Sequence, residues 1–161
     1  MNSYVHQLNY KVKTAKEVGM PKQSINEALV IFKGIEDDFN RFRFLKKHND
    51  PDMALMIISM DILERLNREG WPVKPGDLGE NLTLGEFNYD TLKPGNCYKV
   101  GTVELKISFI CDPCGNLGTL DYVGESKKKS FIKTLLGRRG WYARVTKEGV
   151  IKKRDSFKLI S

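Results

Sequence analysis

Residues 103–114 read VELKISFICDPC, from Val103 to Cys114, and this stretch decides the fold. Apolar and polar residues alternate along its first seven positions, which predicts a β-strand with one buried and one exposed face. The side chains expected to face the core are Val103, Leu105, Ile107 and Phe109. The strand runs without a break into Cys111-Asp-Pro-Cys114, so two thiols are expected in a loop at the end of a rigid element.

Segments of similar character surround this strand. Extended or strand-like runs are expected at 4–12, 27–33, 54–58, 92–100, 141–146 and 150–160. One helix is expected between an N-cap at Ser59 and a stop at Gly70. A second is expected over 126–136, with its inward side chains being Phe131, Ile132, Leu135 and Leu136. Residues 35–52 lack periodicity and are expected to form a long loop.

The order of these elements predicts the fold class. Many short strands, two helices and no βαβ alternation indicate a mainly β protein with a few helices. The expected architecture is a closed or partly open β-barrel with its helices packed outside. The chain has 161 residues and no linker-like tract, so residues 1–161 are expected to form a single domain.

The composition limits where the protein can be located and which partners it can bind. No apolar run reaches the roughly 20 residues of a membrane span, and the N-terminus lacks the apolar region of a signal peptide. We therefore expect a cytoplasmic protein with no membrane partner.

The formal net charge of +7 favours anionic partners and is concentrated at 41–47 and 127–139. Solvated surface would explain these segments equally well, and nucleic acid is the less favoured anion because no nucleic-acid-binding motif accompanies them.

Cys114 is the candidate for chemistry among three cysteines, which are too few and too unevenly spaced for a disulfide framework. It opens a glycine-rich loop, directly after a stiff turn at Pro113. The thiolate is the reactive form, and the basic segment 127–139 would favour it if that segment folded over the loop. A free cysteine is as often a small buried apolar residue, so position alone leaves the two interpretations even.

Cys111 completes a Cys-x-x-Cys motif with Cys114. A thioredoxin-like dithiol is disfavoured, because the motif follows a strand instead of beginning a helix in a βαβ unit. A zinc site would need two more ligands, and Cys97, His6 and His48 fit no zinc-binding spacing. A reversible Cys111–Cys114 disulfide, with Cys111 as the redox partner that protects a reactive thiol, stays open.

Two further blocks carry candidate binding residues. In the block 76–82 (GDLGENL), glycines bracket Glu80 and Asn81, which could line a pocket or serve the turn itself. In the block 137–144 (GRRGWYAR), the neighbouring Arg138 and Arg139 suit the oxygens of a phosphate or carboxylate. The flanking glycines allow the backbone to approach a ligand closely.

Three blocks, taken in order, resemble the MOSC family, the domain found at the C-terminus of molybdenum cofactor sulfurases and as stand-alone proteins. The blocks are 76–83, then Pro113-Cys114 with Leu117, then 140–145 with Glu148-Gly149. The resemblance covers about residues 30–159 and rests on the order and spacing of the blocks. It implies a MOSC or pyruvate-kinase-barrel-like fold with an essential cysteine at Cys114.

The resemblance also implies a ligand. Family members are thought to carry sulfur, or to bind a molybdenum–pterin centre, through this cysteine, so Cys114 would be a molybdenum ligand or would carry a persulfide. The residues implied to contact the cofactor are Glu80, Asn81, Arg138, Arg139 and Arg144. Many members have a basic residue shortly before Pro-Cys, where this chain has Cys111 and Asp112, so anion handling is expected to differ there. The chain has no room for a pyridoxal phosphate site, so sulfur would come from a separate protein such as a cysteine desulfurase.

Three functions follow as hypotheses. The leading one is a MOSC-type sulfur carrier or sulfur transferase that acts on the molybdenum cofactor (molybdopterin), or on a related anionic ligand, through Cys114. The second is a non-catalytic binding module for a phosphorylated small molecule or nucleic acid, which the basic segments motivate. The third is detoxification of N-hydroxylated compounds, with which some stand-alone relatives are associated and which nothing in the sequence favours or excludes.

Overall fold

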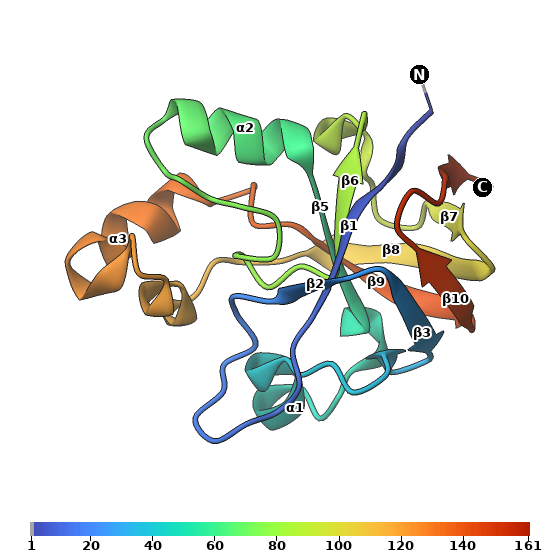
Figure 1. The fold of residues 1–161 in the computed structure, drawn as a ribbon, viewed down its shortest axis with the longest axis horizontal. Helices are drawn as coiled ribbons and strands as arrows, with labels where there is room; N and C mark the ends of the chain where they lie inside the picture. Colours follow the sequence, from blue (N-terminus) through green and yellow to red (C-terminus); the bar gives the residue numbers. More distant parts are fainter. Residues whose placement is uncertain (1) are drawn as a thin grey trace.

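The computed structural model describes residues 2–161 and shows one large curved sheet with a smaller sheet beside it (Figure 1). The large sheet has the strand order β11-β7-β8-β9-β5-β6-β1-β2, and the small one has the order β10-β3-β4. The strands are β1 (Tyr4–Tyr10), β2 (Gln23–Ile25), β3 (Glu27–Ile31), β4 (Gly34–Ile35), β5 (Leu55–Ser59), β6 (Leu82–Gly85), β7 (Cys97–Val100), β8 (Val103–Ile110), β9 (Trp141–Lys147), β10 (Gly149–Lys152) and β11 (Phe157–Leu159). The helices are α1 (Arg41–Lys46), α2 (Met60–Arg68) and α3 (Gly124–Thr134), with short 3-10 turns η1 (Pro51–Met53), η2 (Tyr89–Thr91) and η3 (Gly115–Thr119).

The large sheet curves into a partly open barrel. Near one end of the sheet, β1 returns to the segment just before β11, where Tyr4 and Ser156 form an isolated bridge. The Val5 amide donates to the Asp155 carbonyl across the same gap at 2.8 Å. Buried apolar side chains from the strands and helices form one core cluster. The predicted mainly β, partly open barrel is confirmed.

Strands β5 and β6 are parallel neighbours joined through α2. The expectation that the chain contains no βαβ unit was therefore wrong at this place. All four residues of β6 are buried, and the strand is too short for its sequence, LTLG, to give a clear strand signal. Helix α2 begins directly after Ser59, as predicted, but the buried Ser59 hydroxyl contacts the Asp61 carboxylate instead of capping a backbone amide.

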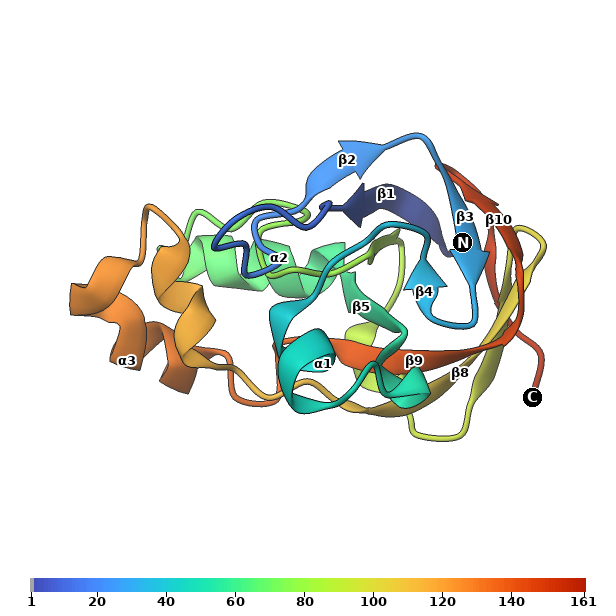
Figure 2. The ribbon, with the colours of Figure 1, turned by 90° about the horizontal axis from the view of Figure 1, so that it is seen from below.

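Helix α3 lies at one end of the molecule, with β3 and β10 at the other, in both views (Figures 1 and 2). It buries Phe131 against Trp71, with ring centroids 4.6 Å apart. Leu135 is buried as predicted, but Leu136 is 62% exposed, because the helix ends at Thr134 and its inward face does not continue. None of the helices between residues 2 and 161 is long and apolar enough to cross a membrane.

Residues 35–52 are not the long loop that was expected, because β4 extends to Ile35 and α1 and η1 also lie there. The Asn40 side chain caps α1 by accepting from the Arg43 amide at 3.0 Å. The buried Arg43 guanidinium donates to the carbonyls of Met53 and Ala54. A six-residue helix held by one buried arginine has no apolar stripe, so periodicity could not reveal it.

Strand β8 confirms the predicted alternation over its first part and departs from it at its end. The first three apolar side chains of the predicted inward face are buried, but Phe109 is 41% exposed. The pairing of β8 with β9 shifts register between Ile107 and Ile110. Such an irregularity changes the direction of the side chains that follow it. Here Phe109 is left partly exposed, and Cys111 is buried.

Candidate functional site

A pocket of about 240 Å³ lies at the end of β8. The 18–20 turn, the start of α1, β5, the 78–79 turn and the start of β9 all contribute to its wall. Its polar lining residues are Asn40, Lys47, Cys111, Asp112, Cys114, Asn116, Arg139 and Tyr142, and its apolar ones include Phe42, Met56 and Phe109. Both thiols of the Cys-x-x-Cys motif and one of the paired arginines therefore share one cavity.

Cys114 lies on the wall of this pocket and is partly exposed. Its backbone is extended, with φ −136° and ψ 172°, and leads into the turn η3. The Cys114 carbonyl accepts from the Leu117 amide at 3.2 Å, which holds the loop in place behind Pro113. Within residues 2–161 no hydrogen bond is made to the Cys114 thiol, so its sulfur is available to a ligand.

Cys111 lines the same pocket but is 4% exposed. Its thiol donates to the Tyr142 hydroxyl, with 3.3 Å between Sγ and Oη. Burial raises the pKa of Cys111, and the nearby Arg139 charge and the Tyr142 contact oppose that rise only in part. Cys111 is therefore a protonated thiol beside the accessible Cys114.

Arg139 is buried in the pocket wall, with 4% of its surface exposed. Its Nη1 donates to the Met56 thioether sulfur at 3.2 Å, and its Nε has no hydrogen-bond partner. The next residue, Gly140, has a φ of +121°, and an added Cβ would lie 2.9 Å from the Ile57 carbonyl oxygen. Only glycine fits this close approach, which presses the backbone beside Arg139 against β5.

Glu80 lies in the core and does not line the pocket. One of its oxygens accepts from the Gly76 amide at 2.6 Å and from the Thr83 hydroxyl at 2.9 Å. The other oxygen has no partner. Burial raises the pKa of Glu80 to about 6, against the lowering effect of these hydrogen bonds. The geometry gives Glu80 the role of closing the 76–80 turn.

Asn81 is also buried and also lies outside the pocket. Its side-chain oxygen accepts from the Met56 amide at 3.0 Å. Its amide nitrogen donates to the Asn9 carbonyl at 3.3 Å and to the Asp38 carboxylate at 2.9 Å. Asn81 thus joins β5, β1 and the segment before α1, and the pocket depends on it only through those elements.

Arg138 and Arg144 lie outside the pocket as well. Arg138 forms a two-pronged ion pair with Glu69, with N–O distances of 2.6 and 2.8 Å. Arg144 pairs with Asp52 at 2.6 Å, on a half-exposed surface. Of the five residues that the resemblance implied for cofactor contact, the structure brings only Arg139 to Cys114.

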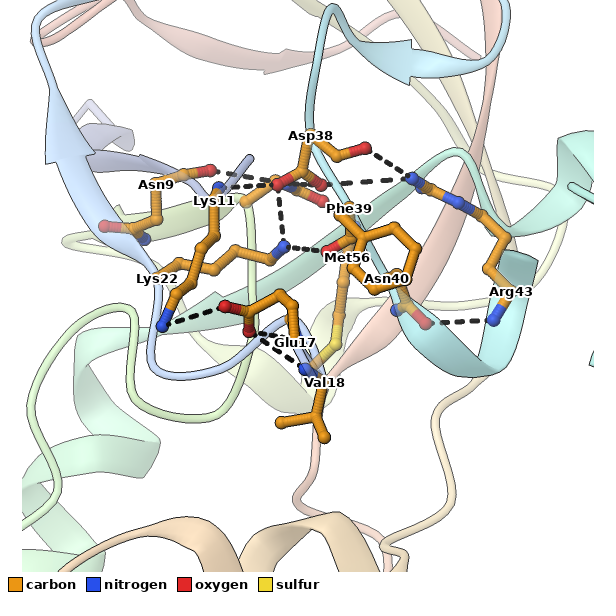
Figure 3. Close-up of polar contacts among 12 residues, drawn as sticks. Asn9, Lys11, Glu17, Val18, Lys22, Asp38, Phe39, Asn40, Arg43 and Met56 are labelled. Carbon is orange, nitrogen blue, oxygen red and sulfur yellow. Dashed lines mark hydrogen bonds and ion pairs between the residues drawn. The ribbon is translucent and has the colours of Figure 1, made fainter. Parts of the chain in front are cut away.

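A buried ionic network lies beside the pocket (Figure 3). Asp38 accepts from Lys22 Nζ at 2.7 Å and from the Lys11 amide at 2.9 Å. Lys22 also donates to the Phe39 carbonyl, and the Arg43 guanidinium lies 3.9 Å from Asp38. Burial lowers the pKa of Lys22, and the Asp38 charge counteracts part of that effect.

The network fixes pocket residues that the sequence did not reveal. Val18, Asn40 and Met56, all drawn in Figure 3, line the pocket next to it. Lys47 lines the pocket too, and the basic segment 41–47 that contains it was the one available signal. Within the second basic segment, 127–139, only Arg139 reaches the cavity.

Fold and site together define a class: a partly open β-barrel whose pocket, at the end of a strand, holds a cysteine after proline. The family model described as "MOSC domain" matches residues 45–158, and the chain belongs to the MOSC domain family. The expected resemblance is confirmed. No curated protein sequence matches the chain significantly.

Solved structures show the same fold. The YuaD protein of Bacillus subtilis superposes with a TM-score of 0.77 at 18% identity, over 98% of this chain and 94% of that one. YiiM from Geobacillus stearothermophilus gives 0.74 at 24% identity, over 99% of this chain and 75% of that one. YiiM from Escherichia coli gives 0.69 at 18% identity, over 100% and 70%.

Proposed function

We propose that this MOSC protein binds a molybdenum–pterin or a related anionic ligand in the pocket, and that Cys114 ligates it or carries sulfur to it. The observation that carries the proposal is the position of Cys114, a partly exposed thiol on the wall of a cavity that also holds a buried guanidinium. Membership of the MOSC family supports the same ligand class.

The residues of the pocket fit such a group. In the part of the chain that the structure describes, no three His, Cys, Asp or Glu side chains are grouped to hold a metal ion. A single accessible thiol therefore suits a metal that arrives already chelated, as it does in a molybdenum–pterin. The guanidinium of Arg139, which lines the pocket and forms no ion pair within residues 2–161, suits an anionic group. The volume of 240 Å³ is below the roughly 300–1,000 Å³ of pockets that enclose whole ligands, so the pocket suits one end of the molecule.

Each lining residue then has a distinct task. A bound molybdenum centre would supply two-electron redox chemistry and transfer of an oxygen or sulfur atom. Cys114 would ligate it as the thiolate, the form of cysteine that binds metals and accepts sulfur. Cys111 stays protonated and donates to Tyr142. Lys47 lines the pocket with its cation 5.7 Å from the Phe42 ring centre, where it attracts anions.

A persulfide trap tests the sulfur-carrying part of this proposal. Freshly isolated wild type, Cys114→Ser and Cys97→Ser are labelled in parallel, with Cys97 as the control because its thiol lies outside the pocket. We expect label on the wild type and on Cys97→Ser, and its loss in Cys114→Ser. Equal labelling of wild type and Cys114→Ser would overturn the sulfur-carrying part.

A binding role without turnover is the second candidate, and the unpaired charge of Arg139 is the observation that favours it. In that role the anion is held by Arg139 and Cys114 is only a neighbour. Ligand binding that survives Cys114→Ser unchanged, together with an absence of sulfur on the wild-type thiol, would select this candidate over the first.

A further inference from the structure

Arg139 carries a charge that nothing around it neutralises by contact. Among residues 2–161 it forms no ion pair, and its one hydrogen bond is to the sulfur of Met56. A guanidinium stays protonated in proteins, so its burial cannot be relieved by loss of the proton. A buried unpaired charge is costly unless another charge is brought to it.

The acidic groups nearby do not fill this role. Glu80 is close enough for the Arg139 charge to act on it, but the free oxygen of Glu80 and the Nε of Arg139 both lack a partner. Asp112 lines the pocket but is exposed to solvent. Apart from the two thiols and Tyr142, the remaining polar lining residues are Asn40, Lys47 and Asn116, which are cationic or neutral.

We propose that the unpaired guanidinium of Arg139 forms a subsite for a phosphate or phosphate-monoester group in this pocket. The inference deepens the proposed function and rests on it only for the nature of the larger ligand. Nη2 makes no hydrogen bond within residues 2–161, since only Nη1 is engaged, and Nε is buried without a partner. A free guanidinium N–H of this kind can donate to a phosphate oxygen.

The pocket has the room and the surroundings for such a group. A cavity of about 240 Å³ accommodates a phosphate group with some of its waters. Asn40 and Asn116 offer neutral donors on the same lining, and Phe42 and Phe109 offer exposed apolar surface to the organic part of an ester. Arg138 offers none of this, because Glu69 already occupies its guanidinium.

The test uses inorganic phosphate as the probe and the folded full chain as the sample. Thermal midpoints of wild type, Arg139→Met and Arg138→Met are measured with phosphate and with sodium chloride at equal ionic strength. We expect phosphate to raise the midpoint of wild type and Arg138→Met, and to leave Arg139→Met unmoved, with its phosphate affinity at least tenfold weaker. In chloride, Arg139→Met should melt no lower than wild type, because an uncompensated buried charge has been removed.

The thermal midpoint of Arg139→Met in chloride separates a ligand site from a structural arginine, because loss of a structural arginine would lower the midpoint in both solutions. No phosphate response in the wild type, or the same response in Arg139→Met, would overturn the proposal. If Arg139→Met does not fold, the Arg139→Lys variant and a titration of the Arg139 Nε–H resonance in the wild type decide the question: a resonance that phosphate does not shift overturns it.

The phosphate test does not depend on whether Cys114 carries sulfur. Cys114→Ser should keep the phosphate response of the wild type, because the serine leaves Arg139 untouched. A wild type that carries no persulfide label but responds to phosphate therefore counts against sulfur carriage alone. Persulfide labelling without a phosphate response counts against the Arg139 subsite alone.

Discussion

Burial separates the two thiols of the Cys111–Cys114 segment although both line one pocket. Cys111 is 4% exposed and donates to Tyr142, whereas Cys114 is partly exposed and unbonded among the described residues. Burial disfavours a thiolate because it removes water from around the charge. The pKa of Cys111 is accordingly raised, so the two thiols differ in reactivity as well as in access.

We expect an alkylating reagent to modify Cys114 and Cys97 before Cys111 in the folded protein. The reason is that alkylation needs an accessible thiolate, and Cys111 offers neither access nor a favoured anion. Timed alkylation followed by peptide mass analysis measures the order. Full modification of Cys111 while Cys114 is still free would contradict this assignment, and denatured protein, in which all three react, is the control.

Glu80 makes stability depend on pH in the direction opposite to an ordinary carboxylate. Its folded pKa, about 6, lies above the unfolded value of 4.5, so the folded state holds the proton more tightly. This contribution is fully present below pH 4.5 and is lost as pH rises through about 6. As the pH rises through that window, we expect the free energy of unfolding of Glu80→Gln to increase by about 2 kcal/mol relative to that of the wild type. Urea unfolding below pH 4.5 and above pH 6 measures this difference. If the stabilities of the two proteins change in parallel with pH, the assignment to Glu80 is wrong.

Arg138 and Arg139 show why the site was only partly predictable. Composition and the flanking glycines indicated that the pair suits anions, but neighbouring residues in a turn face different surroundings. Glu69, which directly follows α2, pairs with Arg138 across 69 residues of sequence, and no local pattern carries that information. Arg139 brings a cation into the cavity that Cys111 and Asp112 also line.

At the scale of elements, the pocket wall depends on the Lys22–Asp38–Arg43 network. Asp38 receives a bond from the chain after β1, from Lys22 and from Asn81, and its side chain is 1% exposed. The segment before α1 is thereby joined to both β1 and β6. Without the Asp38 carboxylate, the buried cations of Lys22 and Arg43 would have no opposite charge beside them.

We therefore expect Asp38→Asn to destabilise the fold by about 3–5 kcal/mol, the usual cost of breaking a buried ion pair from one side. Asp37→Asn is the matched control, because Asp37 is exposed and has a positive φ that asparagine tolerates. Chemical unfolding of the two variants gives the comparison. Equal stabilities would show that the network does not hold the wall.

Elements with clear periodicity were predictable and those held by tertiary contacts were not. The strand over 103–110 and helix α2 follow from their apolar spacing. The end of β8 does not, because a register shift against β9 turns Phe109 outward. Strand β6 and helix α1 are short, and their places are set by Asn81 and Arg43 bonding to distant backbone.

At the scale of the whole molecule, the buried apolar residues form one cluster that reaches from β1 to β11. We expect residues 2–161 to unfold in one cooperative transition. Trp141 at the start of β9 and Trp71 near α3 report on two parts of the fold through fluorescence, and far-ultraviolet circular dichroism reports on the backbone. Coincident transitions are expected, and a separate early transition of one probe would mean that a part of the chain unfolds independently.

The central claim is that Cys114 is where this protein holds its ligand or its sulfur. Intact-mass, peptide-mapping and molybdenum analysis of freshly isolated wild type and Cys114→Ser test it most directly. We expect the wild type to carry an extra sulfur atom mapped to Cys114, or bound molybdenum, and the variant to carry neither. Extra sulfur confined to Cys97 or Cys111, or the same molybdenum content in both proteins, would contradict the claim.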